Sequence, residues 1–127
     1  MKNWIFIIGV LFIGIVGASA AYNSSSDKVL KRVTQTEFKE KMKSLKKYNL
    51  IDVRTKNEYD RGTIEGAINI DYLGPNFKEE LNKLDKETPV LMFCQSGGRS
   101  AKALRIFGDL GFSYVLELAG GYGSWTK

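Results

Sequence analysis

The residue best suited to chemistry is Cys94, the only cysteine in the chain. It follows an apolar run at positions 90–93 and precedes a polar, glycine-rich stretch that ends at Arg99 and Ser100. A cysteine reacts as a thiolate, and a helix N-terminus with a nearby cation can lower its pKa from about 8.5 to roughly 3.5–7.5. We therefore interpret Cys94 as a nucleophile that is activated by the loop following it.

This loop has the composition of an anion cradle. Its two adjacent glycines permit positive φ angles and a close backbone approach. Successive amides in such a turn can point at one anion, and the following helix adds its positive N-terminal end. Arg99 adds a side-chain cation, so we predict that the loop binds a substrate anion or a terminal S–S⁻ group on Cys94. The predicted binding residues are Gln95, Ser96, Gly97, Gly98, Arg99 and Ser100.

Two simpler chemistries do not fit this sequence. The chain has no histidine, which excludes a cysteine–histidine dyad of the protease kind. One cysteine without histidine also excludes a cysteine/histidine zinc site, and we expect neither a metal nor an organic cofactor. The remaining alternative, an inert buried cysteine, needs neither the glycines nor Arg99.

Strands alternate with helices around this loop. The run at 90–93 predicts a strand buried on both faces. Helical spacing from Ser100 to Leu110, with Gly111 in the C-cap region, predicts a helix after the loop. Further strands are expected from Val33 and over residues 48–53, 67–70 and 114–118. Further helices are expected after a cap at Thr36, after a capping box at 55–58, and with Pro75 in the first turn. This order predicts an α/β fold, a small parallel β-sheet flanked by helices on both faces.

Asp52 and Arg54 are polar residues at the end of the 48–53 strand. In open α/β sheets, sites form at the carboxyl ends of strands. These two residues are therefore candidate supports for the site. A purely structural role is the alternative, in which Asp52 bonds loop amides and Arg54 makes an ion pair.

Three segments resemble a known family. CQSGGRS at 94–100 resembles the active-site loop of the rhodanese (sulfurtransferase) domain. IDVR at 51–54, with Glu58, Tyr59 and GAINI at 66–70, is similar to the family's first signature, and GGYGSW at 120–125 to its C-terminal signature. The resemblance covers roughly residues 33–127. The family commonly has histidine and proline where this chain has Thr63 and Glu65, and we expect this departure to concern a structural turn and not the loop.

The resemblance implies a rhodanese-like fold and a sulfurtransferase that carries sulfur as a persulfide on Cys94. The implied partners are a small anionic donor such as thiosulfate and a thiol or cyanide acceptor. We expect no nucleic-acid partner, because the N-terminal residues predict export. One alternative is a non-catalytic sulfur carrier or sensor. Another is an arsenate reductase or phosphatase, although phosphatase-like loops place one residue more between cysteine and arginine than the four found here. The sequence identifies neither the physiological donor, a partner protein nor an oligomeric state.

The first residues have the pattern of an export signal. A lysine at position 2 precedes a continuously apolar run at 4–16, and Ala18-Ser19-Ala20 is a small-x-small cleavage site. We predict a signal peptide at 1–20, a flexible linker at 21–32 and a rhodanese-like domain at 33–127. The rival interpretation is a retained N-terminal anchor, since the apolar stretch is near the lower limit for a membrane span. Both place the domain in the periplasm or another extracytoplasmic compartment, with membrane contact only if the segment is retained.

Overall fold

The computed structural model describes residues 27–127, so the predicted signal peptide or anchor and residues 21–26 of the predicted linker lie outside the described residues. Within the described part, the strands form a five-stranded sheet in the order β1-β5-β4-β2-β3, and every pairing is parallel. The predicted α/β fold with a parallel sheet is confirmed. The strands are β1 (Val29–Val33), β2 (Asn49–Asp52), β3 (Ile68–Asn69), β4 (Val90–Phe93) and β5 (Tyr114–Leu118).

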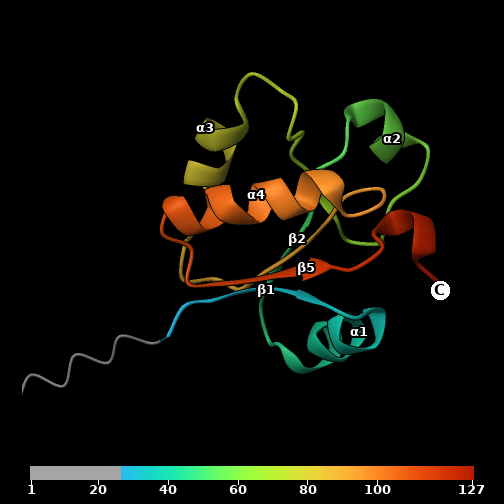
Figure 1. Ribbon diagram of the computed structural model, residues 1–127, viewed down its shortest axis with the longest axis horizontal. Helices are drawn as coiled ribbons and strands as arrows, with labels where there is room; N and C mark the ends of the chain where they lie inside the picture. The colour runs from blue at the N-terminus through green and yellow to red at the C-terminus, as the bar shows by residue number, and fades with distance from the viewer. Residues whose placement is uncertain (1–26) are drawn as a thin grey trace, which may run out of the picture.

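Helices cover both faces of this sheet. α1 lies against one face, whereas α3 and α4 lie against the other (Figure 1). The helices are α1 (Gln35–Ser44), α2 (Lys56–Asp60), α3 (Phe77–Asn82) and α4 (Gly98–Asp109), and a short 3-10 helix, η1 (Tyr122–Ser124), follows β5. None of the helices between residues 27 and 127 is long and apolar enough to cross a membrane.

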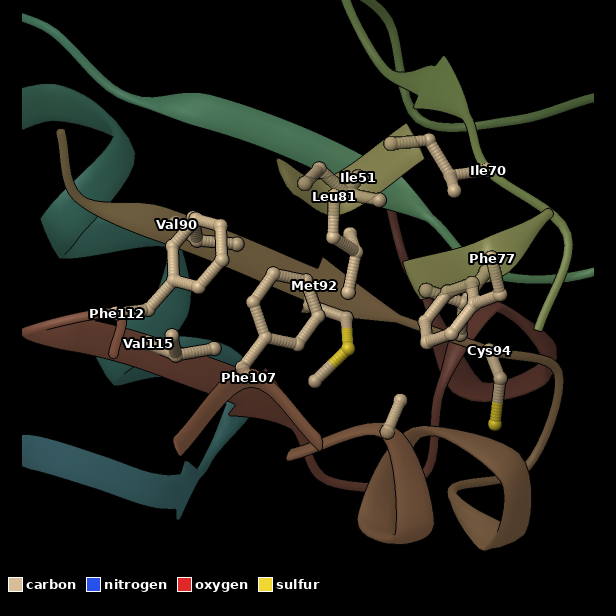
Figure 2. Close-up of a cluster of buried hydrophobic side chains, with 12 residues drawn as sticks. Ile51, Ile70, Phe77, Leu81, Val90, Met92, Cys94, Phe107, Phe112 and Val115 are labelled. Atoms are coloured by element: carbon tan, nitrogen blue, oxygen red, sulfur yellow. The ribbon is translucent and has the colours of Figure 1, made fainter. Parts of the chain in front are cut away.

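The central strand β4 separates two hydrophobic cores. All of its residues are buried, which confirms the strand predicted from the apolar run. Val90 and Met92 face the α3/α4 side with Phe107, whereas Leu91 and Phe93 face the α1 side with Phe38. Cys94 lies at one end of the α3/α4 core (Figure 2). The strand thus carries the cysteine from the middle of the core to the edge where the loop begins.

Two predicted boundaries at the start of the domain differ in the structure. β1 begins at Val29, inside the predicted linker, because Val29 to Val33 pair in parallel with Tyr114 to Leu118 of β5. The α1 cap is Thr34 and not Thr36: Thr34 has extended backbone angles and its side chain accepts a hydrogen bond from the Glu37 amide. The chain therefore turns from β1 into α1 with almost no connection.

The remaining helix starts follow the sequence in part. α3 begins at Phe77 with Asn76 as its N-cap, so Pro75 lies before the helix and not in its first turn as predicted. Thr55 and Glu58 form the predicted capping box of α2. α4 begins at Gly98, two residues before the predicted start at Ser100. Gly97 precedes it with a φ of 106°, a left-handed conformation that favours glycine. Gly97, one of the two glycines predicted to permit a positive φ, therefore lies at the turn between β4 and α4.

Candidate active site

The loop after β4 is fixed from behind by the C-terminal signature. The Tyr122 amide donates to the Cys94 carbonyl (2.8 Å), and the Gly123 amide donates to the Gln95 carbonyl (2.9 Å). Gly121 has a φ of 60°, and a Cβ at this position would collide with the carbonyls of Cys94 and Gln95. Gly121 and Gly123 therefore permit the last segment to lie directly on the loop backbone.

The sulfur of Cys94 is buried and hydrogen-bonded. Cys94 is 1 % exposed. The Gly97 amide donates a hydrogen bond to Sγ (3.1 Å), and Sγ lies 3.3 Å from Ser100 Oγ. Burial raises the pKa of Cys94, but hydrogen bonds from the Ser100 hydroxyl and from the amides of Ser100, Gly97 and Ser96 lower it by more, so that this pKa lies below its ordinary value. The loop thus stabilises a thiolate without a histidine.

A second line of contacts reaches the sulfur from β5. Ser100 Oγ donates to Glu117 Oε1 at 2.5 Å, and Glu117 is 1 % exposed. The Arg32 guanidinium donates to both Glu117 oxygens (2.7 Å each) and to the Gly97 carbonyl (2.7 Å). The hydrogen bond to Glu117 raises the pKa of Arg32. Sequence reasoning missed both Arg32 and Glu117, although a glutamate inside the otherwise apolar run at 115–118 was an available signal.

Arg99 is held by a carboxylate of α2. Its two terminal nitrogens donate to Glu58 Oε1 (2.6 Å) and Oε2 (2.9 Å). The Arg99 hydrogen bond lowers the pKa of Glu58 to about 2, and the same pair raises the pKa of Arg99. Arg99, the predicted cation of the cradle, is therefore paired with Glu58. The Cys94 charge contributes to the raised pKa of Arg99, but Arg99 makes no hydrogen bond to Sγ among the contacts of the described residues.

The predicted supports Asp52 and Arg54 form a buried ion pair beside the loop. Arg54 donates to both Asp52 oxygens (2.7–3.1 Å) and to Gln95 Oε1 (3.0 Å), and its guanidinium lies 4.3 Å from the centre of the Tyr122 ring. Thr63 donates to Asp52 Oδ2 (2.9 Å). The departure at Thr63 is thus joined through Asp52 and Arg54 to the loop, contrary to the expectation that it leaves the loop untouched.

The structure brings all the predicted site residues to one edge of the sheet, in two arrangements. Gly97 and Ser100 contact the sulfur directly, whereas Gln95 and Arg99 face the ion pairs on the side of α2. Ser96 and Gly98 are exposed at the loop surface. An open cavity of about 320 Å³ lies next to the loop, lined by Arg54, Glu58, Arg61, Gly62, Gln95 and Tyr122. It gives a small polar molecule access to this side of the loop.

Comparison with known proteins shows the family. A model of the Rhodanese-like domain matches residues 34–127, and the chain belongs to this family. It is 33% identical over 126 residues to the uncharacterized protein YqhL of Bacillus subtilis, covering 98% of this chain and 94% of that protein. It is 34% identical over 90 residues to thiosulfate sulfurtransferase 16 of Arabidopsis thaliana, covering 63% of this chain and 75% of that protein.

Solved structures show the same fold. A rhodanese-like domain protein from Staphylococcus aureus superimposes with a TM-score of 0.67 at 29% identity, covering 76% of this chain and 92% of that one. The human single-domain sulfurtransferase TSTD1 superimposes with a TM-score of 0.61 at 29% identity, covering 74% and 93%. The chain therefore has a rhodanese-like domain with sulfurtransferases among its relatives.

Proposed function

We propose that this chain is an exported sulfurtransferase that moves a sulfane sulfur from an anionic donor such as thiosulfate to a thiol or cyanide through a persulfide on Cys94. The observation that carries the proposal is the position of Sγ. It lies at the carboxyl end of β4, accepts a hydrogen bond from the Gly97 amide and contacts the Ser100 hydroxyl. This surrounding lowers the pKa of a cysteine that has no neighbouring histidine.

The reaction has two displacements that balance. The Cys94 thiolate attacks the outer sulfur of thiosulfate, an S–S bond forms on Cys94, and sulfite leaves with the electron pair of the broken S–S bond. The loop amides and the N-terminal end of α4 stabilise the negative charge on the new terminal sulfur. Cyanide or a thiolate then attacks that sulfur. The electron pair of the S–S bond to Cys94 stays on the Cys94 sulfur, which is again a thiolate.

Loop length favours sulfur over phosphorus. Four residues separate Cys94 from Arg99, and the Gly97 amide already approaches Sγ itself. A wider loop is needed to seat a tetrahedral oxyanion on the amides while the sulfur attacks its centre. We therefore expect no hydrolysis of aryl phosphates and no reduction of arsenate. Cys94-dependent hydrolysis of a phosphate ester would replace the sulfurtransferase proposal with the phosphatase one.

The test is a thiosulfate:cyanide assay on the domain. The wild-type protein is expected to form thiocyanate with turnover, and Cys94→Ser to form none. Ser44→Ala, at the exposed end of α1, is the matched control and retains wild-type turnover. A wild-type protein that takes up sulfur without turnover would favour the carrier or sensor function, whereas full activity in Cys94→Ser would remove the mechanism.

Export is tested separately at the N-terminus. The small-x-small site predicts that the mature protein begins at Ala21. N-terminal sequencing of the protein recovered from its native cells is expected to find this residue first. Recovery of the uncleaved chain in the membrane fraction would support the retained anchor instead.

A further inference from the structure

The Ser100 hydroxyl lies between two acceptors. Its oxygen is 3.3 Å from Cys94 Sγ on one side and 2.5 Å from Glu117 Oε1 on the other. A hydroxyl carries one proton, so it donates to one of these groups at a time. The contact with Glu117 has the length of a charge-assisted O–H···O⁻ bond, the stronger class of hydrogen bond. Glu117 therefore competes with Cys94 for the Ser100 proton.

The direction of this proton is tied to the state of the sulfur. When Ser100 donates to Glu117, its oxygen can accept a hydrogen bond from the Cys94 thiol, and all three groups are satisfied. A thiolate needs the opposite direction, with the Ser100 proton pointing at Sγ. In that state Glu117 still accepts two hydrogen bonds from Arg32, so a buried carboxylate is not left without a partner.

We propose that Glu117 and Arg32 are positioning residues for Cys94: Glu117 retains the Ser100 proton and favours the thiol, whereas Arg32 weakens that hold and favours the thiolate. This inference deepens the proposed function, because it names what sets the charge of the nucleophile. The two residues are register partners on β1 and β5. Arg32 also donates to the Gly97 carbonyl, which places its positive charge next to the loop.

Two further ion pairs lie beside the loop on other elements, and Arg61 lines the cavity next to it. Arg99 of α4 is bound by Glu58 of α2, with Asp71 acting on Arg99 through its charge. Arg54 is bound by Asp52 at the end of β2. None of these groups contacts Ser100 or Glu117 among the hydrogen bonds of the described residues. Substitutions of Arg32 and Glu117 leave these charges in place, so the variants alter one ion pair only.

The experiment is the pH dependence of Cys94 alkylation by iodoacetamide, a neutral reagent that measures the thiolate without attracting it to a cation. Four proteins are compared: wild type, Glu117→Gln, Arg32→Gln and the double variant. Glu117→Gln is expected to move the midpoint to lower pH and to alkylate about three- to tenfold faster at a pH below it. Arg32→Gln is expected to move the midpoint to higher pH. The double variant, in which neither charge remains, is expected to return close to the wild-type midpoint.

Two controls separate this inference from a structural role. Lys31→Gln removes an exposed neighbouring cation of β1 that pairs with Glu37, and it is expected to leave the midpoint unchanged. In a Ser100→Ala background, Glu117→Gln is expected to lose most of its shift, because the hydroxyl that connects it to the sulfur is gone. Thermal unfolding confirms that each variant is folded at the pH of measurement.

Several outcomes would overturn the proposal. Shifts of the same sign in Arg32→Gln and Glu117→Gln would show damage to the loop and not control of the proton. A higher midpoint and slower alkylation in Glu117→Gln would make Glu117 a base that removes the thiol proton. A full shift retained without the Ser100 hydroxyl would exclude the hydroxyl as the connection. Alkylation needs no sulfur donor, so these results stand apart from the turnover assay that tests the proposed function.

Discussion

The loop after β4 has two sides that use charge differently. On the α2 side, Arg99 pairs with Glu58 and Arg54 with Asp52, and none of these four side chains hydrogen-bonds to Cys94 Sγ in the described structure. On the β5 side, Ser100 contacts Sγ and links it to Glu117, whose partner is Arg32. Paired charges beside a loop can hold its backbone in place, whereas groups in contact with a sulfur set its pKa. We therefore expect the α2 side to control stability and the β5 side to control reactivity.

The largest effect is expected from breaking the buried pair on the α2 side. Arg54→Met leaves Asp52 buried without its cation and removes the hydrogen bond to Gln95. Loss of one partner of a buried pair costs about 3–5 kcal/mol. Urea denaturation measures this loss of unfolding free energy. A loss below about 1 kcal/mol, the range of an exposed ion pair, would show that the pair does not hold the loop.

A smaller loss is expected from Thr63→Val, which keeps the shape of the side chain and removes the hydroxyl that donates to Asp52. A hydrogen bond to a charged group contributes about 1.5–3 kcal/mol. Thr36→Val, at an exposed position of α1, makes the same chemical change and is expected to leave the unfolding free energy nearly unchanged. Equal losses in both variants would remove Thr63 from the network behind the loop.

The Glu58–Arg99 pair predicts a pH dependence of stability. The pKa of Glu58 is lowered from 4.5 to about 2 in the folded chain. Its stabilisation is therefore present above about pH 4.5 and is lost as the pH falls toward 2. Glu58→Gln is expected to cost about 1 kcal/mol at neutral pH and to approach the wild-type stability near pH 2. Urea denaturation from pH 7 to pH 2 measures both proteins, and a constant difference across this range would contradict the pairing.

The smallest effect sharpens the comparison directly. Arg99→Ala is expected to raise the alkylation midpoint of Cys94 by less than Arg32→Gln does, because Glu58 already compensates the Arg99 charge. In this variant Glu58 is free to face water. The same iodoacetamide titration measures the change in midpoint. An Arg99 shift larger than the Arg32 shift would reverse the roles of the two sides.

These two sides also differ in how far the sequence predicts them. The nucleophile, the glycine turn and the α2 capping box follow from local patterns: an apolar run that ends at Cys94, Gly97 before a helix, and Thr55 three residues before Glu58. The β5 side depends on the parallel register that places Arg32 opposite Glu117. Local patterns do not specify which strands pair when they are far apart in the sequence, or in which register they pair. The start of β1 at Val29 depends on the same pairing, because β5 extends β1 back from Val33. The α1 cap differs for a local reason: β1 ends at Val33, and Thr34, the next residue, accepts a hydrogen bond from the Glu37 amide.

The central claim is that Cys94 becomes a persulfide in this loop, and intact-mass spectrometry of the folded domain after incubation with thiosulfate tests it most directly. The wild-type protein is expected to gain the mass of one sulfur atom, which a thiol reductant removes and which peptide mapping places on Cys94. Cys94→Ser is expected to gain none. Absence of the added sulfur from the wild-type protein with both thiosulfate and a polysulfide donor, or its presence on Cys94→Ser, would contradict the account.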